Sequence, residues 1–325
     1  MRMMDGMKRV ALPPQPQPLH PSRPPSAGSG FMSDIPSSPA VNLPPVFPRE
    51  QVVDEVVYDY MRRSERMGWS AYDLVDEESI AALARPERLN EYQRSAVKTV
   101  LFVEDHLPGY LSEYLRVLHD PAIPDDQYIV NRQVLHYTFR WVAEEDRHAH
   151  VLEMYMTKAG LITRPELQLE MAKERKKAFN FPFEQLEETF IYLALQEKAT
   201  HLYYRALAKD IDEPLLKTIL GKMGADEASH GTFFYDLLIK NNRGDLDALS
   251  RKISAVATDF RMPVQSNLDN YRRQLLNMMR AAPSYRHPDV FTDMMRTVER
   301  AAKTYSRESL TLITPELGPF ARAVE

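Results

Sequence analysis

Cysteine is missing altogether from the 325 residues of this chain. Without a thiol the chain can form no disulfide framework, zinc–thiolate site, iron–sulfur cluster or cysteine nucleophile. Any metal must therefore be bound by carboxylates and imidazoles, which the 46 acidic residues and 9 histidines supply. Long hydrophobic runs are missing too, so no membrane span is expected. The formal charge of −5 and the pI near 6 argue against a nucleic-acid binder, because phosphates require a basic surface.

Proline is scarce outside the first part of the chain. Residues 1–48 hold 12 of the 24 prolines, with four basic and two acidic residues, so the rest of the chain has a formal charge of −7. Such a segment buries too little apolar surface to offset the entropy of ordering. We therefore expect a disordered Pro-rich tail over 1–48 and one domain over 49–325. The tail is either dispensable or a docking site for a partner domain, and Met32 is an alternative start.

Beyond residue 50 the sequence is typical of helices. Glycine totals only 11 residues in the whole chain, and the evenly spaced turn signals of an all-β fold are absent. Apolar residues recur at helical spacing over four long segments, 88–118, 126–159, 182–209 and 212–241, the first of them interrupted at Pro108. Shorter helices are predicted over 50–63, 165–178, 245–259, 264–281 and 288–305. The prediction is an all-α fold, with a four-helix bundle core and additional flanking helices.

Two of the long segments contain the same pair of metal-binding side chains. Glu145 and His148 lie three residues apart, and so do Glu227 and His230. On a helix this spacing puts both side chains on one face. Taken alone, each pair could equally be a solvated surface pair.

Each of these pairs follows a helix with one glutamate in an apolar stretch. These glutamates are Glu104, in TVLFVEDHLPGY, and Glu197, in FIYLALQEKATHLYY. One Glu from each of two helices and Glu-x-x-His from each of two others is the ligand layout of ferritin-like carboxylate bundles. Two divalent ions would balance the four carboxylates, which could not otherwise be buried together. The order therefore predicts a dinuclear metal site in a ferritin-like bundle.

Longer motifs surround these six residues. They are VEDHLPGY at 103–110, WVAEEDRH at 141–148, QEKAT at 196–200, ADEASH at 225–230 and RMP at 261–263, with Trp69 upstream. In this combination, the chain from about residue 50 to 300 resembles the soluble acyl-acyl-carrier-protein desaturases of plant and actinobacterial type. The resemblance implies two iron ions, each bound by two glutamates and one histidine: Glu104, Glu145 and His148 for one, and Glu197, Glu227 and His230 for the other. It further implies that Glu145 and Glu227 bridge the two ions.

The resemblance also implies roles for residues next to the ligands. Thr200 would lie beside the oxygen-binding face and deliver or order protons, although a helix-interior threonine can simply bond its own backbone. Asp226 and Trp69 would form an electron-entry route through hydrogen bonds to His230. The implied reaction is oxygen-dependent desaturation of an acyl chain on acyl carrier protein, with an electron donor such as ferredoxin. A homodimer in the cytoplasm is expected.

The chain departs from the family pattern after two of the motifs. His201, Tyr203 and Tyr204 follow QEKAT where the family has an apolar residue and a Ser-His pair. After His148 the family commonly has glycine, whereas here Ala149 and His150 follow. We expect this lining to be bulkier and more polar, which leaves hydroxylation or N-oxygenation of a carrier-bound or free metabolite as the alternative. A metal-storage or radical-harbouring subunit is a further class, with the candidate tyrosines Tyr110, Tyr137, Tyr203 and Tyr235. The ligand set accepts manganese as well as iron.

A carrier-bound substrate requires a basic landing surface, because acyl carrier proteins are acidic. Two clusters are candidates, and each could equally be a solvated helix face: Arg62, Arg63 and Arg66, or Lys173, Arg175, Lys176 and Lys177.

Overall fold

The structure is a computed structural model that describes residues 46–262 and 268–305. The helices are α1 (Glu50–Met67), α2 (Ala71–Leu74), α3 (Glu77–Leu83), α4 (Glu91–Glu104), α5 (Leu107–Leu118), α6 (Asp125–Lys158), α7 (Arg164–Arg175), α8 (Leu186–Asp210), α9 (Pro214–Asn241), α10 (Leu246–Thr258), α11 (Tyr271–Ala281) and α12 (Pro288–Tyr305), with one 3₁₀ turn at Pro86–Arg88. The described residues contain no β-strand, which confirms the all-α prediction. Within them, no helix is both long and apolar enough to cross a lipid bilayer.

Local sequence signals set most of the helix ends. Asn90 forms a capping box with Gln93 at the start of α4, and Thr163 forms one with Glu166 at the start of α7. Pro214 is the first residue of α9, where its missing N–H removes no helical hydrogen bond. The segment predicted over 88–118 is two helices, α4 and α5, which separate just before Pro108. The short helices α2 and α3 were not predicted, and residues 264–267 of the segment predicted over 264–281 lie outside the described residues.

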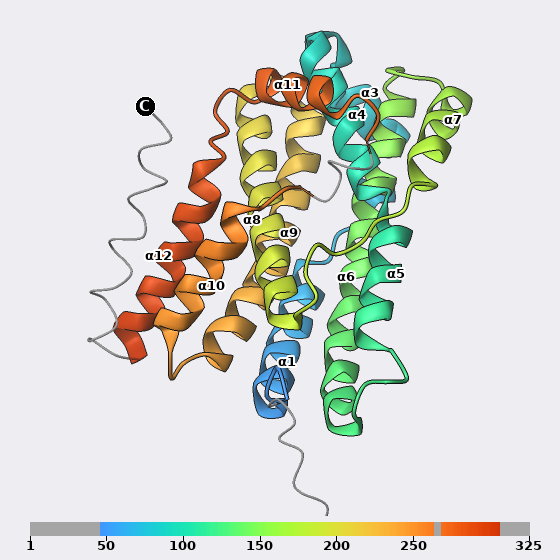
Figure 1. The fold of residues 1–325 in the computed structure, drawn as a ribbon. Coiled ribbons are helices and arrows are strands. Elements are labelled where there is room, and N and C mark those ends of the chain that lie inside the picture. The colour runs from blue at the N-terminus through green and yellow to red at the C-terminus, as the bar shows by residue number, and fades with distance from the viewer. Residues whose placement is uncertain (1–45, 263–267, 306–325) are drawn as a thin grey trace, which may run out of the picture. The chain divides into compact units, whose positions relative to one another are not determined.

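The core of the bundle is formed by α4, α6, α8 and α9 (Figure 1). Helix α8 packs along α9, α6 contacts both α4 and α9, and α1 packs against α6 and α9. Helices α10 and α12 flank α8, and α11 lies on α4. The arrangement brings the end of α4 and the middle turns of α6, α8 and α9 to face one another.

Two apolar clusters fill this bundle, and the middle turns lie between them. On α6 the first cluster ends at Trp141 and the second begins at Ala149. On α9 the second cluster ends at Met223 and the first resumes at Phe233. The turns between these residues contain both predicted Glu-x-x-His pairs. The chain therefore places its candidate ligands in one buried layer between two apolar layers.

The predicted tail lies almost entirely outside the described residues. Met32 is among the residues not described, and so is the whole stretch up to residue 45. At its end, the Phe47 backbone N–H donates to Gln127 Oε1 at 2.9 Å, and the Phe47 ring lies 6.1 Å from that of Phe190, centroid to centroid. The chain is therefore attached to the core already at Phe47, three residues before α1.

Candidate metal centre

The six predicted ligands meet in the middle of the bundle, all of them buried. Each of the four core helices contributes one or two of them: Glu104 from the end of α4, Glu145 and His148 from α6, Glu197 from α8, and Glu227 and His230 from α9. They form two overlapping groups with ligand atoms within 4.8 Å of one another, and both groups share Glu145 and Glu227.

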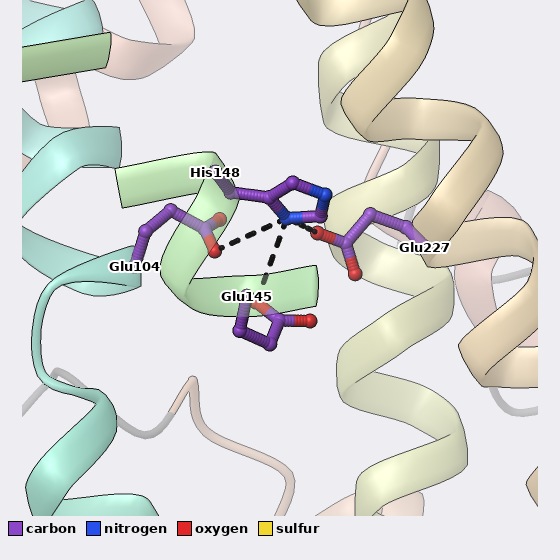
Figure 2. Close-up of side chains that lie close together, drawn as sticks. All are labelled: Glu104, Glu145, His148 and Glu227. Carbon is purple, nitrogen blue, oxygen red and sulfur yellow. Dashed lines mark ion pairs between the residues drawn. The ribbon is translucent and has the colours of Figure 1, made fainter. Parts of the chain in front are cut away.

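The first group surrounds the imidazole of His148. Its Nδ1 atom lies 3.3 Å from Glu227 Oε1, and 3.6 Å from both Glu104 Oε2 and Glu145 Oε2. Figure 2 shows the three carboxylates converging on this nitrogen from three helices. One nitrogen and three carboxylates at one point are the donors of a divalent metal site.

The second group repeats this arrangement around His230. Its Nδ1 atom lies 2.9 Å from Glu145 Oε1, 3.5 Å from Glu227 Oε2 and 3.6 Å from Glu197 Oε2. Glu145 and Glu227 thus each direct one oxygen to the His148 side and the other to the His230 side. Carboxylates oriented in this way can bridge two metal ions.

The other ring nitrogen of His148 is held by Asp226. The distance from Nε2 to Asp226 Oδ2 is 3.1 Å, and the same oxygen accepts bonds from Trp69 Nε1 and Arg147 Nη2, both at 2.8 Å. The indole stacks on the His148 imidazole with an interplanar angle of 11°. The sequence analysis expected Asp226 and Trp69 to connect to His230. That expectation was wrong, because Asp226 on α9 reaches across to the histidine of α6.

His230 is held in the same way by a residue that the sequence analysis missed. Its Nε2 lies 2.9 Å from Glu144 Oε2 on α6, and that oxygen also accepts a hydrogen bond from Tyr60 at 2.6 Å. Ser64 donates to the other oxygen of Glu144, which also pairs with Arg140 at 3.2 Å. A signal was present, since Glu144 directly precedes Glu145 as Asp226 directly precedes Glu227. Each acid orients the histidine of the opposite helix, as partners of metal-bound histidines commonly do.

Burial and nearby charges shift the pKa values of three central carboxyls, those of Glu104, Glu145 and Glu197. Burial, reinforced by the charge of Glu145, raises the pKa of Glu104 to about 8. Burial, with the charge of Glu227, likewise raises the pKa of Glu197 well above its usual range. Burial also acts to raise the pKa of Glu145, but the imidazoles of His148 and His230 close to its two oxygens outweigh it and hold that pKa well below its usual value. Without a cation, this site cannot ionise all of its acids at neutral pH.

The site has buried polar atoms that a bound cation would satisfy. Within the described residues, no hydrogen bond reaches the Nδ1 atoms of both histidines or one carboxylate oxygen on each of three ligands, Glu145, Glu197 and Glu227. Buried polar atoms of this kind are normally paired. Here they all face the space between the four helices, close together but without hydrogen-bond geometry. Four carboxylates and two imidazoles with free inward lone pairs fit a pair of divalent ions.

An apolar cavity of about 510 Å³ lies beside the metal centre, between α4, α8 and α11. Thr200 and Tyr204 are in its wall, and the Tyr204 hydroxyl donates a hydrogen bond to Glu104 Oε1. The Thr200 hydroxyl donates to the Gln196 carbonyl at 3.1 Å, the backbone bond that was one of its two predicted alternatives. The cavity therefore ends at residues that contact the ligands or lie one turn from them.

Of the residues that depart from the family pattern, some line this cavity and others do not. Tyr203 and Tyr204 line it, with the Tyr203 hydroxyl bonded to the Met278 carbonyl at 3.2 Å. His201 instead bonds the Gly224 carbonyl at 2.7 Å through Nδ1, and the His150 ring lies 5.1 Å from that of Tyr72. Neither histidine lines the cavity, so only the two tyrosines make its wall bulkier and more polar.

The candidate radical tyrosines are all buried, but none has a hydroxyl bond to a ligand. The Tyr235 hydroxyl bonds the Ala194 carbonyl at 3.4 Å. Those of Tyr110 and Tyr137 have no hydrogen-bond partner among the described residues. Tyr204, one of the residues that depart from the family pattern, does contact a ligand, because its hydroxyl donates to Glu104.

Comparison with known proteins agrees with this site. A family model described as fatty acid desaturase matches residues 50–312. A Mycobacterium tuberculosis protein named as an acyl-(acyl-carrier-protein) desaturase, DesA1, is 25% identical over 237 residues, which are 65% of each chain. A coriander chloroplast palmitoyl-(acyl-carrier-protein) 4-desaturase is 28% identical over 148 residues, 43% of this chain and 37% of that one.

The fold has a solved counterpart as well. The X-ray structure titled as the acyl-carrier-protein desaturase DesA2 of Mycobacterium tuberculosis superposes with a TM-score of 0.53 at 19% identity, covering 83% of this chain and 98% of that one. This likeness confirms the predicted ferritin-like helical fold. Because the family model spans most of the chain, from α1 through α12, this protein belongs to the fatty acid desaturase family.

Proposed function

We propose that this chain is a di-iron desaturase that introduces a double bond into an acyl chain carried on acyl carrier protein. The observation that carries the proposal is the pair of buried ligand groups that share Glu145 and Glu227. The apolar cavity beside them supports an acyl substrate, and the names of the mycobacterial and plant relatives supply the carrier.

The protein would bind one ion through Glu104 and His148 and the other through Glu197 and His230, with Glu145 and Glu227 between them. When bound there, a pair of iron ions supplies the activation of dioxygen that oxidation of an unactivated C–H bond requires. In the overall reaction, two adjacent methylenes lose two hydrogens. Two external electrons and two protons complete the reduction of dioxygen to two waters.

The chain's own residues position the substrate and control water and protons. The apolar wall, with Val100, Val103 and Ala199, would hold the acyl chain and exclude water near the ligands. Thr200 can rotate its hydroxyl from the Gln196 carbonyl toward the cavity and hold or pass a proton there. The partly buried Trp69 bonds Asp226, and Asp226 bonds His148. This chain of hydrogen bonds is the candidate route for electrons.

The test is a single-turnover assay with stearoyl-acyl carrier protein. Iron-loaded protein is reduced with a ferredoxin system, exposed to dioxygen, and the acyl product is analysed by mass spectrometry. Desaturation gives a product lighter by two hydrogens, whereas hydroxylation gives a product heavier by one oxygen. A Glu145→Gln variant, which loses a ligand shared by both ions, serves as the inactive control. An acyl chain that is never converted to the lighter product would overturn the proposal.

A further inference from the structure

Helix α11 is basic, with an exposed apolar strip. Its sequence, YRRQLLNMMRA, has three arginines and no acidic residue. Arg272, Arg273 and Arg280 are exposed, and so are Leu276 and Met279, at 53% and 58%. Exposed apolar side chains among charges of one sign are typical of an interaction surface. We call these five residues the α11 surface.

This surface lies at the mouth of the apolar cavity. Leu275 and Met279 of α11 line the cavity and are exposed at the same time, and so are Arg261 and His287 across from them. The opposite end of the cavity is closed by Ala199, Tyr204 and other buried residues next to the ligands. An elongated substrate that reaches the metal centre through this cavity must therefore pass α11. In Figure 1 the helix lies across the upper end of the bundle.

The charges of the α11 surface are available to a partner. Neither Arg272 nor Arg273 forms an ion pair with another described residue, whereas Arg280 lies over the Tyr92 ring at 5.0 Å. The acid nearest the start of α11 in sequence is Asp269, and Lys177 neutralises it at 2.8 Å. This contact joins the residues just before α11 to those just after α7, where Lys173 and Lys176 are exposed. The positive charge thus continues beyond the helix.

The two basic clusters predicted as carrier-binding candidates lie at different places relative to the cavity. The cluster at the end of α7 contacts Asp269, which directly follows Leu268 of the cavity wall. The cluster on α1 is on a helix that packs against α6 and α9 and contributes no residue to the cavity wall. In that cluster Arg63 lies 3.9 Å from Asp236, and Arg66 bonds the Arg62 carbonyl.

We infer that the α11 surface is the docking site of the acidic acyl carrier protein, and that the acyl chain enters the cavity beside Leu275 and Met279. This inference rests on the proposed function, which supplies the carrier as partner. Charge complementarity favours the carrier, because the arginines would face its acidic surface while Leu276 and Met279 make the apolar contact. Docking at the mouth places the tethered end of the substrate outside and its chain inside.

The experiment compares two double charge reversals in the full chain. Arg272→Glu with Arg273→Glu changes the α11 surface, and Arg62→Glu with Arg66→Glu changes the same number of exposed arginines on α1. Fluorescently labelled stearoyl-acyl carrier protein is titrated with each protein, and thermal unfolding confirms that the variants are folded. At low salt we expect the α11 pair to raise Kd about tenfold or more, and the α1 pair to change it less than about twofold. The difference should shrink at high salt.

Each other outcome decides against the inference. An unchanged Kd for the α11 pair, equal losses for both pairs, or no binding of the carrier by the unmodified protein would overturn it. Vesicles rich in phosphatidylglycerol test the competing partner, since a basic helix with exposed leucines also suits an anionic membrane. Binding of vesicles, but not of the carrier, through Arg272 and Arg273 would assign the surface to a membrane instead.

The binding assay involves no turnover, so it separates the two proposals. A chain that binds the carrier through α11 but yields no lighter acyl product keeps this inference and loses the desaturase function. A chain that desaturates the acyl chain but binds the carrier equally well after the α11 reversal keeps the function and loses the docking site.

Discussion

At the scale of single residues, the geometry of the candidate metal centre depends on hydrogen bonds made outside the ligand set. Both ligand histidines use Nδ1 toward the centre, and an acid on the opposite helix fixes Nε2: Asp226 for His148 and Glu144 for His230. Glu104 is fixed differently, by the hydroxyl of Tyr204. Such contacts commonly change metal affinity 10- to 100-fold, so these residues matter almost as much as the ligands.

Tyr204 offers a clean test, because its neighbour provides a matched control. Tyr204→Phe removes the hydrogen bond to Glu104 and leaves the ring, so we expect the affinity for Fe²⁺ or Mn²⁺ to fall about tenfold. Tyr203→Phe removes a hydroxyl from the same cavity wall, but that hydroxyl bonds a backbone carbonyl. Anaerobic metal titration followed by metal analysis measures both. Equal affinities in the two variants would show that the Tyr204 hydroxyl does not position Glu104.

The sequence predicted the ligands better than the contacts around them. Glu145 and His148 could be found because three-residue spacing on one helix fixes which side chains share a face. The partner of His230 could not be found in that way, because Glu144 and His230 are 86 residues apart and meet only through the packing of α6 on α9. Asp226 was identified as a histidine partner but assigned to the wrong histidine for the same reason.

At the scale of helices, the aromatic layer below the metal centre fixes α6 against α9. Phe233 of α9 stacks on Tyr137 of α6, with ring centroids 3.6 Å apart and an interplanar angle of 4°. Tyr60 of α1 packs edge-on against both rings. These contacts hold the three helices at the level from which Glu144 and His230 approach each other. Misplacing this layer would misplace the ligands.

A substitution in that layer should therefore be costly. Phe233→Ala removes a fully buried ring, and we expect it to lower the free energy of unfolding by about 3–5 kcal/mol. Phe139→Ala removes the same side chain from α6 at a position where it is 50% exposed, so its effect should stay below about 1 kcal/mol. Urea unfolding followed by circular dichroism measures both. Similar losses for the two variants would argue against a tightly packed layer at Phe233.

The helices themselves were largely predictable, and their contacts were not. Long amphipathic segments gave α6, α8 and α9 to within a few residues, because apolar spacing and turn residues act locally. The helices α2 and α3 were missed, since four and seven residues are too short to show a helical period. The position of α11 over the cavity mouth depends on contacts with α4, which is 167 residues earlier at its nearest end. No local pattern indicates such a contact.

At the scale of the whole molecule, the metal centre is a source of instability in the metal-free protein. Four carboxyls share one buried layer, and their burial and mutual repulsion oppose folding when they ionise. Divalent ions offset this repulsion, because an ion that binds only the folded state raises the free energy of unfolding. Stability without metal and capacity to bind metal should therefore change in opposite directions when a ligand is neutralised.

Glu104→Gln tests this trade-off. The folded-state pKa of Glu104, about 8, lies above the unfolded value of 4.5, so the carboxyl destabilises the metal-free fold increasingly as pH rises between these values. We expect the metal-free variant to be more stable than the parent by about 1–3 kcal/mol at pH 7, with little difference at pH 5. Added Mn²⁺ should stabilise the parent more than the variant, which keeps only the ligand group around His230 complete.

Thermal and urea unfolding with and without the ion measure these differences. An equal gain at both pH values would mean that ionisation of Glu104 is not the cause. A variant that Mn²⁺ stabilises as much as the parent would remove Glu104 from the ligand set.

The crossed pairs, Asp226 with His148 and Glu144 with His230, have one more consequence. Each pair joins α6 to α9, and the two pairs run in opposite directions, so sliding one helix along the other by a single turn would break both. They therefore lock the register of the two helices before any ion arrives. The metal would enter a cage that is already assembled, and little of its binding free energy would be spent on ordering the protein.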